Sequence, residues 1–205
     1  LYKIVNRKAT YLFMDIFGTK PVFNETQQRI IDAATSCVKR WGVEKTSLND
    51  IAKEAGVTRP TVYNYFPNRQ DILSTALVQS TYDFAERLYT HFRKFKTPRS
   101  RLLEAVLFCV ETLPNEHSLT LLTGSDLSVF VNEGALTNEF SQQVRLSLFK
   151  EILKDSGLSE AELVELTEFA TRMLLSLLMT RSAIPRDRGA LKGFLERRML
   201  PGCGL

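Results

Sequence analysis

Apolar residues recur at steps of three and four along almost the whole chain of 205 residues, and no stretch shows the strict alternation of a half-buried β-strand. No glycine occurs between Gly56 and Gly124. Because glycine often interrupts helices, its absence there allows long helices in the middle of the chain. The pattern predicts an all-α protein, and the length predicts between one and two domains.

Helix boundaries are marked by polar residues that can cap a helix and by the glycines and prolines that end one. Asn24 and Gln27 form a capping-box pair, and Gly42 supplies a left-handed stop to the same helix. Ser47 with Asp50 signals the next helix in the same way. Together with the apolar spacing, these signals predict helices over residues 24–41, 47–55, 58–66, 68–95, 98–113, 137–155, 160–184 and 187–199, with one or two short helices between residues 116 and 134.

Basic residues are concentrated in the first third of the chain. Residues 1–75 contain 11 lysines and arginines against 7 aspartates and glutamates, whereas residues 76–205 contain 16 of each. This asymmetry favours a polyanionic partner for the N-terminal part. Most of the excess precedes residue 24, because residues 24–75 contain 7 basic and 6 acidic residues. A nucleic-acid prediction therefore depends on a motif rather than on charge.

The three cysteines Cys37, Cys109 and Cys203 are far apart and form no CxxC pair, so neither a disulfide framework nor a zinc site is indicated. No apolar stretch approaches the roughly 18 residues of a membrane span. Residues 3–17 come nearest to a signal peptide, but Asp15 interrupts their apolar run. We expect a cytoplasmic protein with no cofactor, no metal and no membrane partner.

Residues 46–73 carry the most informative pattern. Two short helical stretches are separated by the tight turn Ala55-Gly-Val57. This is the arrangement of a helix-turn-helix, whose second helix enters the major groove of DNA. Apolar side chains would hold both helices against the first helix of the chain. The side chains expected in this core are Ile30, Ala34, Ile51, Ala52, Val57, Val62 and Phe66.

The motif reads Thr46-Ser-Leu-Asn-Asp-Ile-Ala52, then Ala55-Gly-Val-Thr-Arg-Pro-Thr-Val-Tyr-Asn-Tyr-Phe-Pro-Asn-Arg69, then Ile72-Leu73. With uninterrupted spacing over residues 26–75, it resembles the DNA-binding domain of TetR-family transcriptional regulators. The resemblance implies a bacterial, homodimeric, all-helical regulator, usually a repressor, with an N-terminal three-helix helix-turn-helix domain and a C-terminal helical domain for ligand binding and dimerisation.

We therefore divide the chain into three parts. Residues 1–23 are an N-terminal lead of uncertain origin, within which Met14 offers an alternative start. Residues 24–73 form the helix-turn-helix DNA-binding domain. Residues 74–205 form the effector-binding and dimerisation domain.

The resemblance implies DNA contacts for nine residues. These are Ser47, Asn49, Arg59, Pro60, Thr61, Tyr63, Asn64, Tyr65 and Arg69. Arg59 is suited to base readout, because its planar fork can bind guanine O6 and N7 together. Pro60, Thr61 and Tyr63 would complete the reading face with Arg59. Tyr65 and Arg69 would contact phosphates, and the role of Asn64 is open. For Ser47, capping of the following helix is an equally good explanation.

The C-terminal domain is expected to bind a small effector. Aromatic and polar residues at helical spacing are candidates for lining its pocket, although such residues more often belong to a core. They are Tyr89, Phe92, Phe108, Thr112, His117, Phe149 and Met173. No group of charged residues interrupts the apolar helices, which favours a hydrophobic effector.

Dimerisation is indicated by residues 173–179, which are apolar on nearly every face of their predicted helix. With the last helix they would form a four-helix interface across a two-fold axis. The residues expected in it are Leu174, Leu177, Leu178, Leu191, Phe194 and Leu195. A core helix buried within one chain is the alternative.

Three other functions compete with a DNA-binding repressor. An enzyme is disfavoured, because GxSxG, P-loop, HExxH and dinucleotide motifs are missing and neither His91 nor His117 lies beside a nucleophile in the sequence. An activator or ligand-sensing regulator of the same fold has the same sequence signature. A structural helical bundle would bind genomic DNA no tighter than random duplex. We predict a ligand-responsive repressor that binds a pseudo-palindromic double-stranded operator as a dimer.

Overall fold

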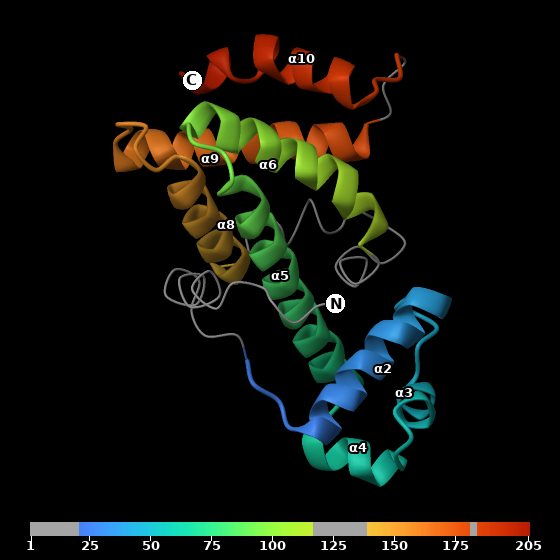
Figure 1. The fold of residues 1–205 in the computed structure, drawn as a ribbon. Coiled ribbons are helices and arrows are strands. Elements are labelled where there is room, and N and C mark those ends of the chain that lie inside the picture. The colour runs from blue at the N-terminus through green and yellow to red at the C-terminus, as the bar shows by residue number, and fades with distance from the viewer. Residues whose placement is uncertain (1–20, 117–138, 181–183) are drawn as a thin grey trace. The chain divides into compact units, whose positions relative to one another are not determined.

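The structure of the protein, a computed structural model, describes residues 21–116, 139–180 and 184–205 (Figure 1). This part of the chain consists of helices and loops and contains no β-strand. It divides into two compact units, an N-terminal one with residues 21–84 and Glu116, and a C-terminal one with residues 85–115, 139–180 and 184–205. The all-α prediction is confirmed.

The first helix of the N-terminal unit, α2 (Glu25–Trp41), begins with the expected capping box. The Asn24 side chain accepts a hydrogen bond of 2.9 Å from the Gln27 backbone N–H, and the Gln27 side chain accepts one of 3.1 Å from the Asn24 N–H. Gly42 ends the helix with a φ of 82°. The prediction that a glycine ends this helix is confirmed. The predicted left-handed helical conformation is wrong, because the ψ of Gly42 is 166°, an extended value.

Helices α3 (Leu48–Glu54) and α4 (Arg59–Tyr65) form the helix-turn-helix. Ser47 and Thr58 cap them, each with a side chain that accepts a hydrogen bond from the backbone N–H three residues later. Between the helices, Gly56 adopts a φ of 65°, a conformation that glycine reaches without the steric cost of a Cβ. The two local caps and this glycine explain why the chain reverses so tightly here.

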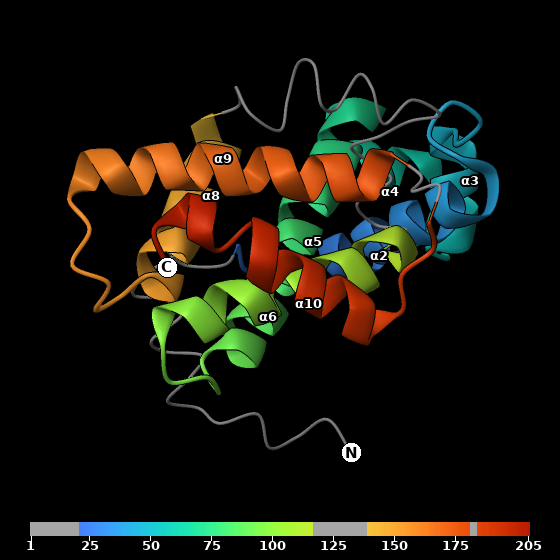
Figure 2. The ribbon, with the colours of Figure 1, turned by 90° about the horizontal axis from the view of Figure 1, so that it is seen from above.

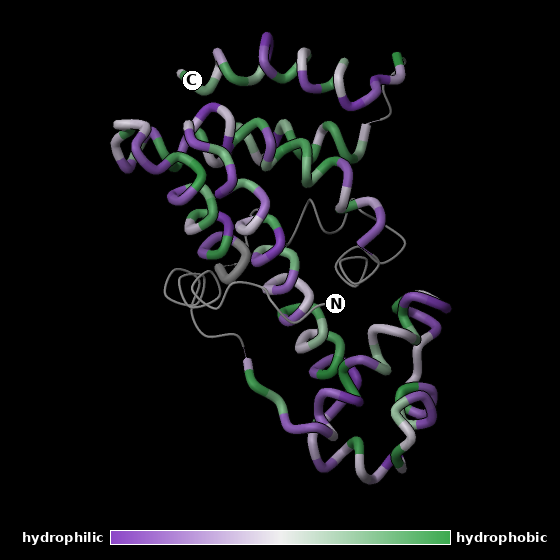
Figure 3. The backbone as a smooth tube through the Cα atoms, viewed as in Figure 1, coloured by the Kyte–Doolittle hydropathy of each residue, from purple (hydrophilic) through white to green (hydrophobic). Residues whose placement is uncertain are grey.

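Helix α5 (Arg69–Phe92) completes the core of the N-terminal unit with its first turns. Ile72 is fully buried, and Leu73 and Ala76 are nearly so. Hydrophobic and hydrophilic residues are interspersed along the helices of this unit (Figure 3), as expected of helices with one apolar side. The predicted core is confirmed for Ile30, Ala34, Ile51, Ala52, Val62 and Phe66, which are buried together, and for Val57, which packs against them partly buried.

Helix α5 is continuous, and its two ends belong to different units. The division falls between residues 84 and 85, inside this helix, whereas the sequence-based boundary lies at residues 73 and 74. At its far end, Phe92 is 1% exposed and forms part of the core of the C-terminal unit.

The C-terminal unit continues with α6 (Pro98–Thr112), a short 3-10 helix (Leu113–Asn115), α8 (Glu139–Ile152), α9 (Glu160–Met179), α10 (Arg188–Arg198) and a second 3-10 helix (Pro201–Cys203). Helix α6 is central, because it contacts α8, α9 and α10. Figure 2 shows α10 lying across α6. Leu102 and Leu107 of α6 and Leu195 of α10 are fully buried. None of the helices described is long and apolar enough to cross a membrane.

Besides α8, which ends at Ile152 rather than Asp155, two helices end earlier than the apolar spacing predicts. Helix α5 ends at Phe92 rather than near Phe95, because the chain tightens into a turn in which the Phe95 N–H donates to the Phe92 carbonyl at 3.0 Å. Helix α9 ends at Met179 rather than Ile184, because Thr180 adopts an extended conformation. Apolar residues continue past both points, so their spacing could not mark the ends.

A buried carboxylate holds part of the C-terminal unit together. Glu104 of α6 is 7% exposed. Its Oε2 accepts a hydrogen bond of 2.8 Å from Arg188 Nη2 and lies 3.6 Å from His91 Nε2, while its Oε1 lies 3.7 Å from Lys192 Nζ. Arg188 also pairs with Glu111. The network connects the end of α5 and the start of α10 to the central helix.

The three cysteines are free and buried. Burial raises the pKa of the Cys109 thiol to about 12 and that of the Cys203 thiol to about 11, so both are protonated near neutral pH. Burial also raises the pKa of Cys37, in line with its expected role as a small buried hydrophobe. Within the described residues, no group of three histidine, cysteine or acidic side chains is placed to hold a metal ion.

Candidate nucleic-acid interface

Helix α4 presents a polar face to solvent. Val62 is fully buried and Phe66, one turn later, is 5% exposed. Because about four residues complete a helical turn, the side chains between these two anchors point outward. The exposed residues of α4 as a whole are Arg59, Pro60, Tyr63, Asn64 and Tyr65, and Thr61 is half-buried. Six of the nine residues predicted to contact DNA therefore lie together on one short helix.

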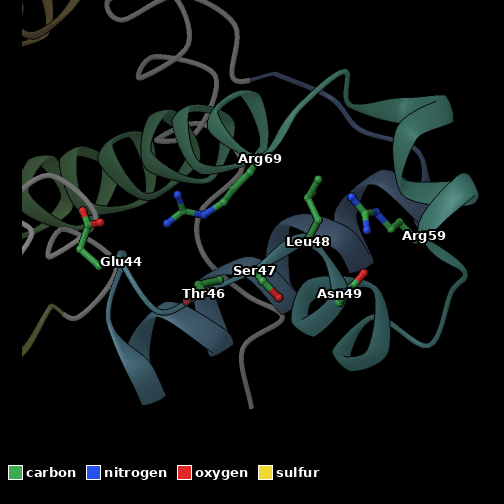
Figure 4. Close-up of a pocket in the computed structure, with 7 residues that line it drawn as sticks. All are labelled: Glu44, Thr46, Ser47, Leu48, Asn49, Arg59 and Arg69. Carbon is green, nitrogen blue, oxygen red and sulfur yellow. The ribbon is translucent and has the colours of Figure 1, made fainter.

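A hollow of about 290 Å³ lies beside this face. It is lined by Glu44, Thr46, Ser47, Leu48, Asn49, Arg59 and Arg69 (Figure 4). The hollow thus brings together four of the predicted DNA contacts, from α3, α4 and the start of α5. Arg59 and Arg69 lie on either side of Leu48 (Figure 4). Two guanidinium groups against the single carboxylate of Glu44 give the hollow a positive balance, which suits an anion.

The Arg59 side chain contacts Tyr63, one turn further along α4. Arg59 Nη2 donates a hydrogen bond of 3.1 Å to the Tyr63 hydroxyl. The Arg59 guanidinium also lies over the ring, with its Cζ atom 5.5 Å from the centroid. Tyr63 is 44% exposed and Tyr65 is 37% exposed, both high for aromatic residues of a small helical unit. The Tyr63 ring and the Arg59 guanidinium thus form one amphipathic surface.

Ser47 is exposed, and its hydroxyl is engaged in the capping box of α3. It accepts a hydrogen bond of 3.2 Å from the Asp50 N–H and donates one of 2.5 Å to the Asp50 carboxylate. Hydrogen bonds from Ser47 hold the pKa of Asp50 below its usual range. The capping role of Ser47 is confirmed, while its DNA contact stays a prediction. Asn49, two positions later, is exposed.

Arg69 is half-buried at the start of α5, in a different setting from the free phosphate-binding side chain expected. Its Nη2 donates to the Val43 carbonyl in the loop between α2 and α3. Its Nε is buried and has no hydrogen-bond partner in the described part of the chain. Arg69 therefore ties this loop to α5, and it is also one of the residues that line the hollow.

Two residues of this region make contacts that the sequence pattern did not predict. Thr46 is 2% exposed, and its hydroxyl donates to the Gly42 carbonyl at 2.8 Å, which closes the loop before α3. Arg29 of α2 donates to the carbonyls of Ala55 and Gly56 in the turn of the motif. The position of Thr46 just before a cap could have indicated the first contact. Nothing local could have indicated the second, whose partners lie more than twenty positions along the chain.

The residues predicted to line an effector pocket belong to the C-terminal unit, apart from His117, which lies outside the described residues. Tyr89 and Phe92 are buried, and their rings meet edge to face with centroids 5.5 Å apart. Phe108 is half-buried against the imidazole of His91, with centroids 4.8 Å apart. The others, Thr112, Phe149 and Met173, are half-buried on α6, α8 and α9. A core role explains Tyr89 and Phe92 fully.

The residues predicted to form a dimer interface differ in burial. Leu174, Leu177 and Leu178 on α9 are half-buried, as are Leu191 and Phe194 on α10. Leu195 has no exposed surface, because it packs in the core of its own chain with Met199 and Leu200. It cannot touch a partner directly and is removed from the interface. In α9, the buried residues Leu166, Thr167 and Ala170 all precede the apolar stretch of residues 173–179, which contains none.

Comparison with known proteins connects this geometry to a family. Residues 30–76 match the family model described as bacterial regulatory proteins, tetR family. Over 181 residues, the chain is 32% identical to the HTH-type transcriptional regulator AcrR of Shigella flexneri, which covers 87% of this chain and 80% of that protein. The chain belongs to the TetR family.

Solved structures share the fold of this TetR-family chain. The fatty acid degradation regulator FadR from Bacillus halodurans has a TM-score of 0.64 at 21% identity and covers 88% of this chain and 97% of its own. The transcriptional regulator FadR from Bacillus subtilis, solved in complex with stearoyl-CoA, has a TM-score of 0.56 at 21% identity and covers 85% and 98%. The TetR-family chain is a DNA-binding transcriptional regulator, so the prediction of a regulator rather than an enzyme is confirmed.

Proposed function

We propose that this TetR-family regulator is a ligand-responsive repressor that reads a pseudo-palindromic operator through the exposed face of α4. The observation that carries the proposal is the Arg59 guanidinium, exposed on α4 at the edge of a positively balanced hollow. Arg59 reads a guanine, because its fork matches O6 and N7. Its neighbours Pro60, Thr61 and Tyr63 form the reading face with it, and Asn64 lies beside them on α4.

The remaining residues of the site bind the DNA backbone. Phosphate contacts fix the register of a protein on the duplex without reading sequence. Tyr65 supplies a hydroxyl group for them from α4. Ser47 and Asn49 supply polar side chains at the start of α3, and Arg69 supplies a charge. The Val43 carbonyl accepts from one nitrogen of the Arg69 guanidinium. A phosphate in the hollow accepts hydrogen bonds from the rest of this group.

We infer that the regulator is a homodimer, because a palindrome needs two reading helices about 34 Å apart. The supporting observation is the stretch of residues 173–179 in α9, which is apolar in sequence yet has no buried side chain in a single chain. Leu174, Leu177 and Leu178 form the α9 side of the interface, and Leu191 and Phe194 form the α10 side. Such an isologous contact is self-complementary.

Leu178→Glu tests the dimer, since a charge at an apolar interface is costly to bury. We expect sedimentation to give a monomer at concentrations where the unmodified protein is a dimer. Val164→Glu is the matched control, because Val164 is 49% exposed on the same helix but lies in its first half. A dimer that survives Leu178→Glu places the interface elsewhere.

The effector is a hydrophobic small molecule bound in the C-terminal unit among Phe108, Thr112, Phe149 and Met173. The half-buried apolar side chains there and the complex of Bacillus subtilis FadR with stearoyl-CoA support this choice. Helix α5 contributes residues to both units, so a ligand that shifts it changes the setting of α4 on DNA. Bound DNA then lowers the affinity for the ligand by the same factor by which the bound ligand lowers the affinity for DNA. The protein acts in the cytoplasm, where a bacterial chromosome lies.

Selection of bound sequences from a random duplex pool is the decisive experiment. We expect a pseudo-palindrome whose half-sites are centred about one helical turn apart. Binding to the selected duplex no tighter than to a random one at moderate salt would overturn the proposal. Titration with stearoyl-CoA, and with free stearate and CoA as controls, then tests the effector class. A ligand that binds without changing operator affinity does not act as an inducer.

A further inference from the structure

The turn between α3 and α4 is held by an arginine from a third helix. Arg29 lies on α2, and its Nη2 donates to the Ala55 carbonyl at 2.5 Å and to the Gly56 carbonyl at 3.3 Å. These carbonyls lie at the C-terminal end of α3, where the helix dipole is negative. A guanidinium suits this place, because it is permanently charged and can serve two acceptors at once.

The short helices of the motif need such support. Helices α3 and α4 have seven residues each, too few to be stable outside tertiary packing. Backbone hydrogen bonds from Gly56 and Val57 close the end of α3. The carbonyls that Arg29 binds lie between this closed end and Arg59, the first residue of α4. A change in the turn is therefore passed directly to the first residue of the reading face.

Gly56 and Arg29 occupy adjoining space. A Cβ at position 56 would lie 3.0 Å from Arg29 Nη2, closer than ordinary van der Waals contact. Glycine is thus required at this position for two reasons. One is the φ of 65°, and the other is the guanidinium that covers the turn. A side chain at position 56 therefore requires the Arg29 guanidinium to shift from its place beside the carbonyls.

We propose that Arg29 is a positioning residue that sets the angle of α4 against α3 and, through it, the register in which α4 meets the bases. Arg29 lies just outside the matched family segment of residues 30–76. It acts through the turn and not on DNA, so it affects selectivity between sequences and not the number of phosphates neutralised. The proposal rests on α4 being the reading helix.

The test compares Arg29→Ala with Arg40→Ala on the selected operator and on a random duplex of equal length. Arg40 is the matched control, because it also joins α2 to α3, but through the side chain of Glu54 and not through the turn. For Arg29→Ala we expect the ratio of operator to random affinity to fall about tenfold, as for one misread base pair. The salt dependence should stay unchanged. Arg40→Ala should change neither quantity.

Two results would overturn the proposal. One is an operator preference that Arg29→Ala leaves within about twofold of the unmodified value, below the effect of one mismatch. The other is an equal loss on both duplexes with the salt slope reduced by about one, which indicates a direct phosphate contact. If Arg29→Ala does not fold, Arg29→Lys is measured instead, because it keeps the charge and can serve one carbonyl.

A double-mutant cycle with Gly56→Ala gives an independent readout. The backbone strain of alanine at this φ is the same with or without Arg29, so it cancels in the cycle. We expect Gly56→Ala to reduce operator preference strongly in the unmodified protein and several-fold less in the Arg29→Ala background. Additive losses would overturn the coupling. If the unmodified protein binds the selected and the random duplex equally well, the result overturns the proposed DNA-reading role of α4.

Discussion

Arg59 and Tyr63 hold each other on the exposed face of α4, the guanidinium lying over the ring and donating to its hydroxyl. A free arginine side chain on a surface samples many rotamers and loses that freedom on binding. Here two contacts to one neighbour already restrict it. The cost of ordering Arg59 on DNA is therefore lowered before the complex forms. The pairing of residues one turn apart prepares the side chain proposed to read a base.

We expect Arg59→Ala to relax selectivity at one symmetric base pair of the operator by about 1–3 kcal/mol. Competition between operator variants, each altered at one position, measures this directly. Tyr63→Phe is the informative companion, because it keeps the ring and removes the hydroxyl that accepts from Arg59. It should lose part of the same selectivity. A uniform loss across all positions would assign Arg59 to the backbone.

Arg69→Ala should weaken binding to all duplexes alike and reduce the salt slope by about one, since its proposed partner is a phosphate. The same substitution removes the hydrogen bond to the Val43 carbonyl, so the melting temperature should also fall. Arg69→Lys separates the effects, because it keeps the charge but cannot reproduce the planar fork. A change in sequence preference with Arg69→Ala would contradict the phosphate assignment.

The stability of the C-terminal unit depends on the side chains that pair with the buried carboxylate of Glu104. Arg188→Ala removes the hydrogen bond to Glu104 Oε2 and leaves a buried acceptor poorly satisfied. We expect a loss of about 1–3 kcal/mol in the free energy of unfolding, read from denaturant titration. Arg172→Ala breaks an exposed pair with Glu168 one turn away and should cost less than about 0.5 kcal/mol. Equal losses would mean that Glu104 is stabilised without Arg188.

Acid should destabilise the protein through its helix caps. Ser47 holds the pKa of Asp50 below its usual range, and Ser159 does the same for Glu162. A carboxyl whose folded pKa is lowered stabilises the fold above its unfolded pKa of about 4, and this stabilisation is lost as the pH falls through the folded pKa. We expect Asp50→Asn with Glu162→Gln to lower the melting temperature at pH 7.

The same double variant should melt with the unmodified protein once the pH lies below both folded pKa values. Melting curves between pH 2 and pH 7, followed by circular dichroism, measure this convergence. A difference that persists unchanged across the whole range would mean that the caps stabilise the helices through packing and not through charge. Ser100→Ala serves as a control, because Ser100 forms the capping box of α6 with Thr97 and neither side chain titrates.

Local chemistry made most of the N-terminal unit predictable. Asn24, Ser47 and Thr58 are caps whose partners lie three residues away, so a short window of sequence contains both members of each pair. The alternation that buries Val62 and exposes Tyr63 is equally local. The reading face of α4 could be predicted for this reason, although its DNA contacts stay predictions.

Contacts between distant positions could not be predicted. The partners of Arg29 follow it by more than twenty residues, and those of Glu104 lie on α5 and α10. Leu195 shows the same limit on one helix. Its spacing is compatible with either face of α10, and only the fold places it in the core of its own chain. Apolar periodicity gives the existence of a helix but neither its neighbours nor its final turn.

The place of the single tryptophan has a spectroscopic consequence. Trp41 ends α2 in the N-terminal unit, is 44% exposed and has the Arg40 guanidinium over its ring, with Cζ 5.3 Å from the centroid. Its emission therefore reports on the unit that carries the helix-turn-helix, whereas far-ultraviolet dichroism averages over every helix. Recording both on one sample distinguishes a chain that unfolds in a single step from one whose DNA-reading unit melts separately, with no label added.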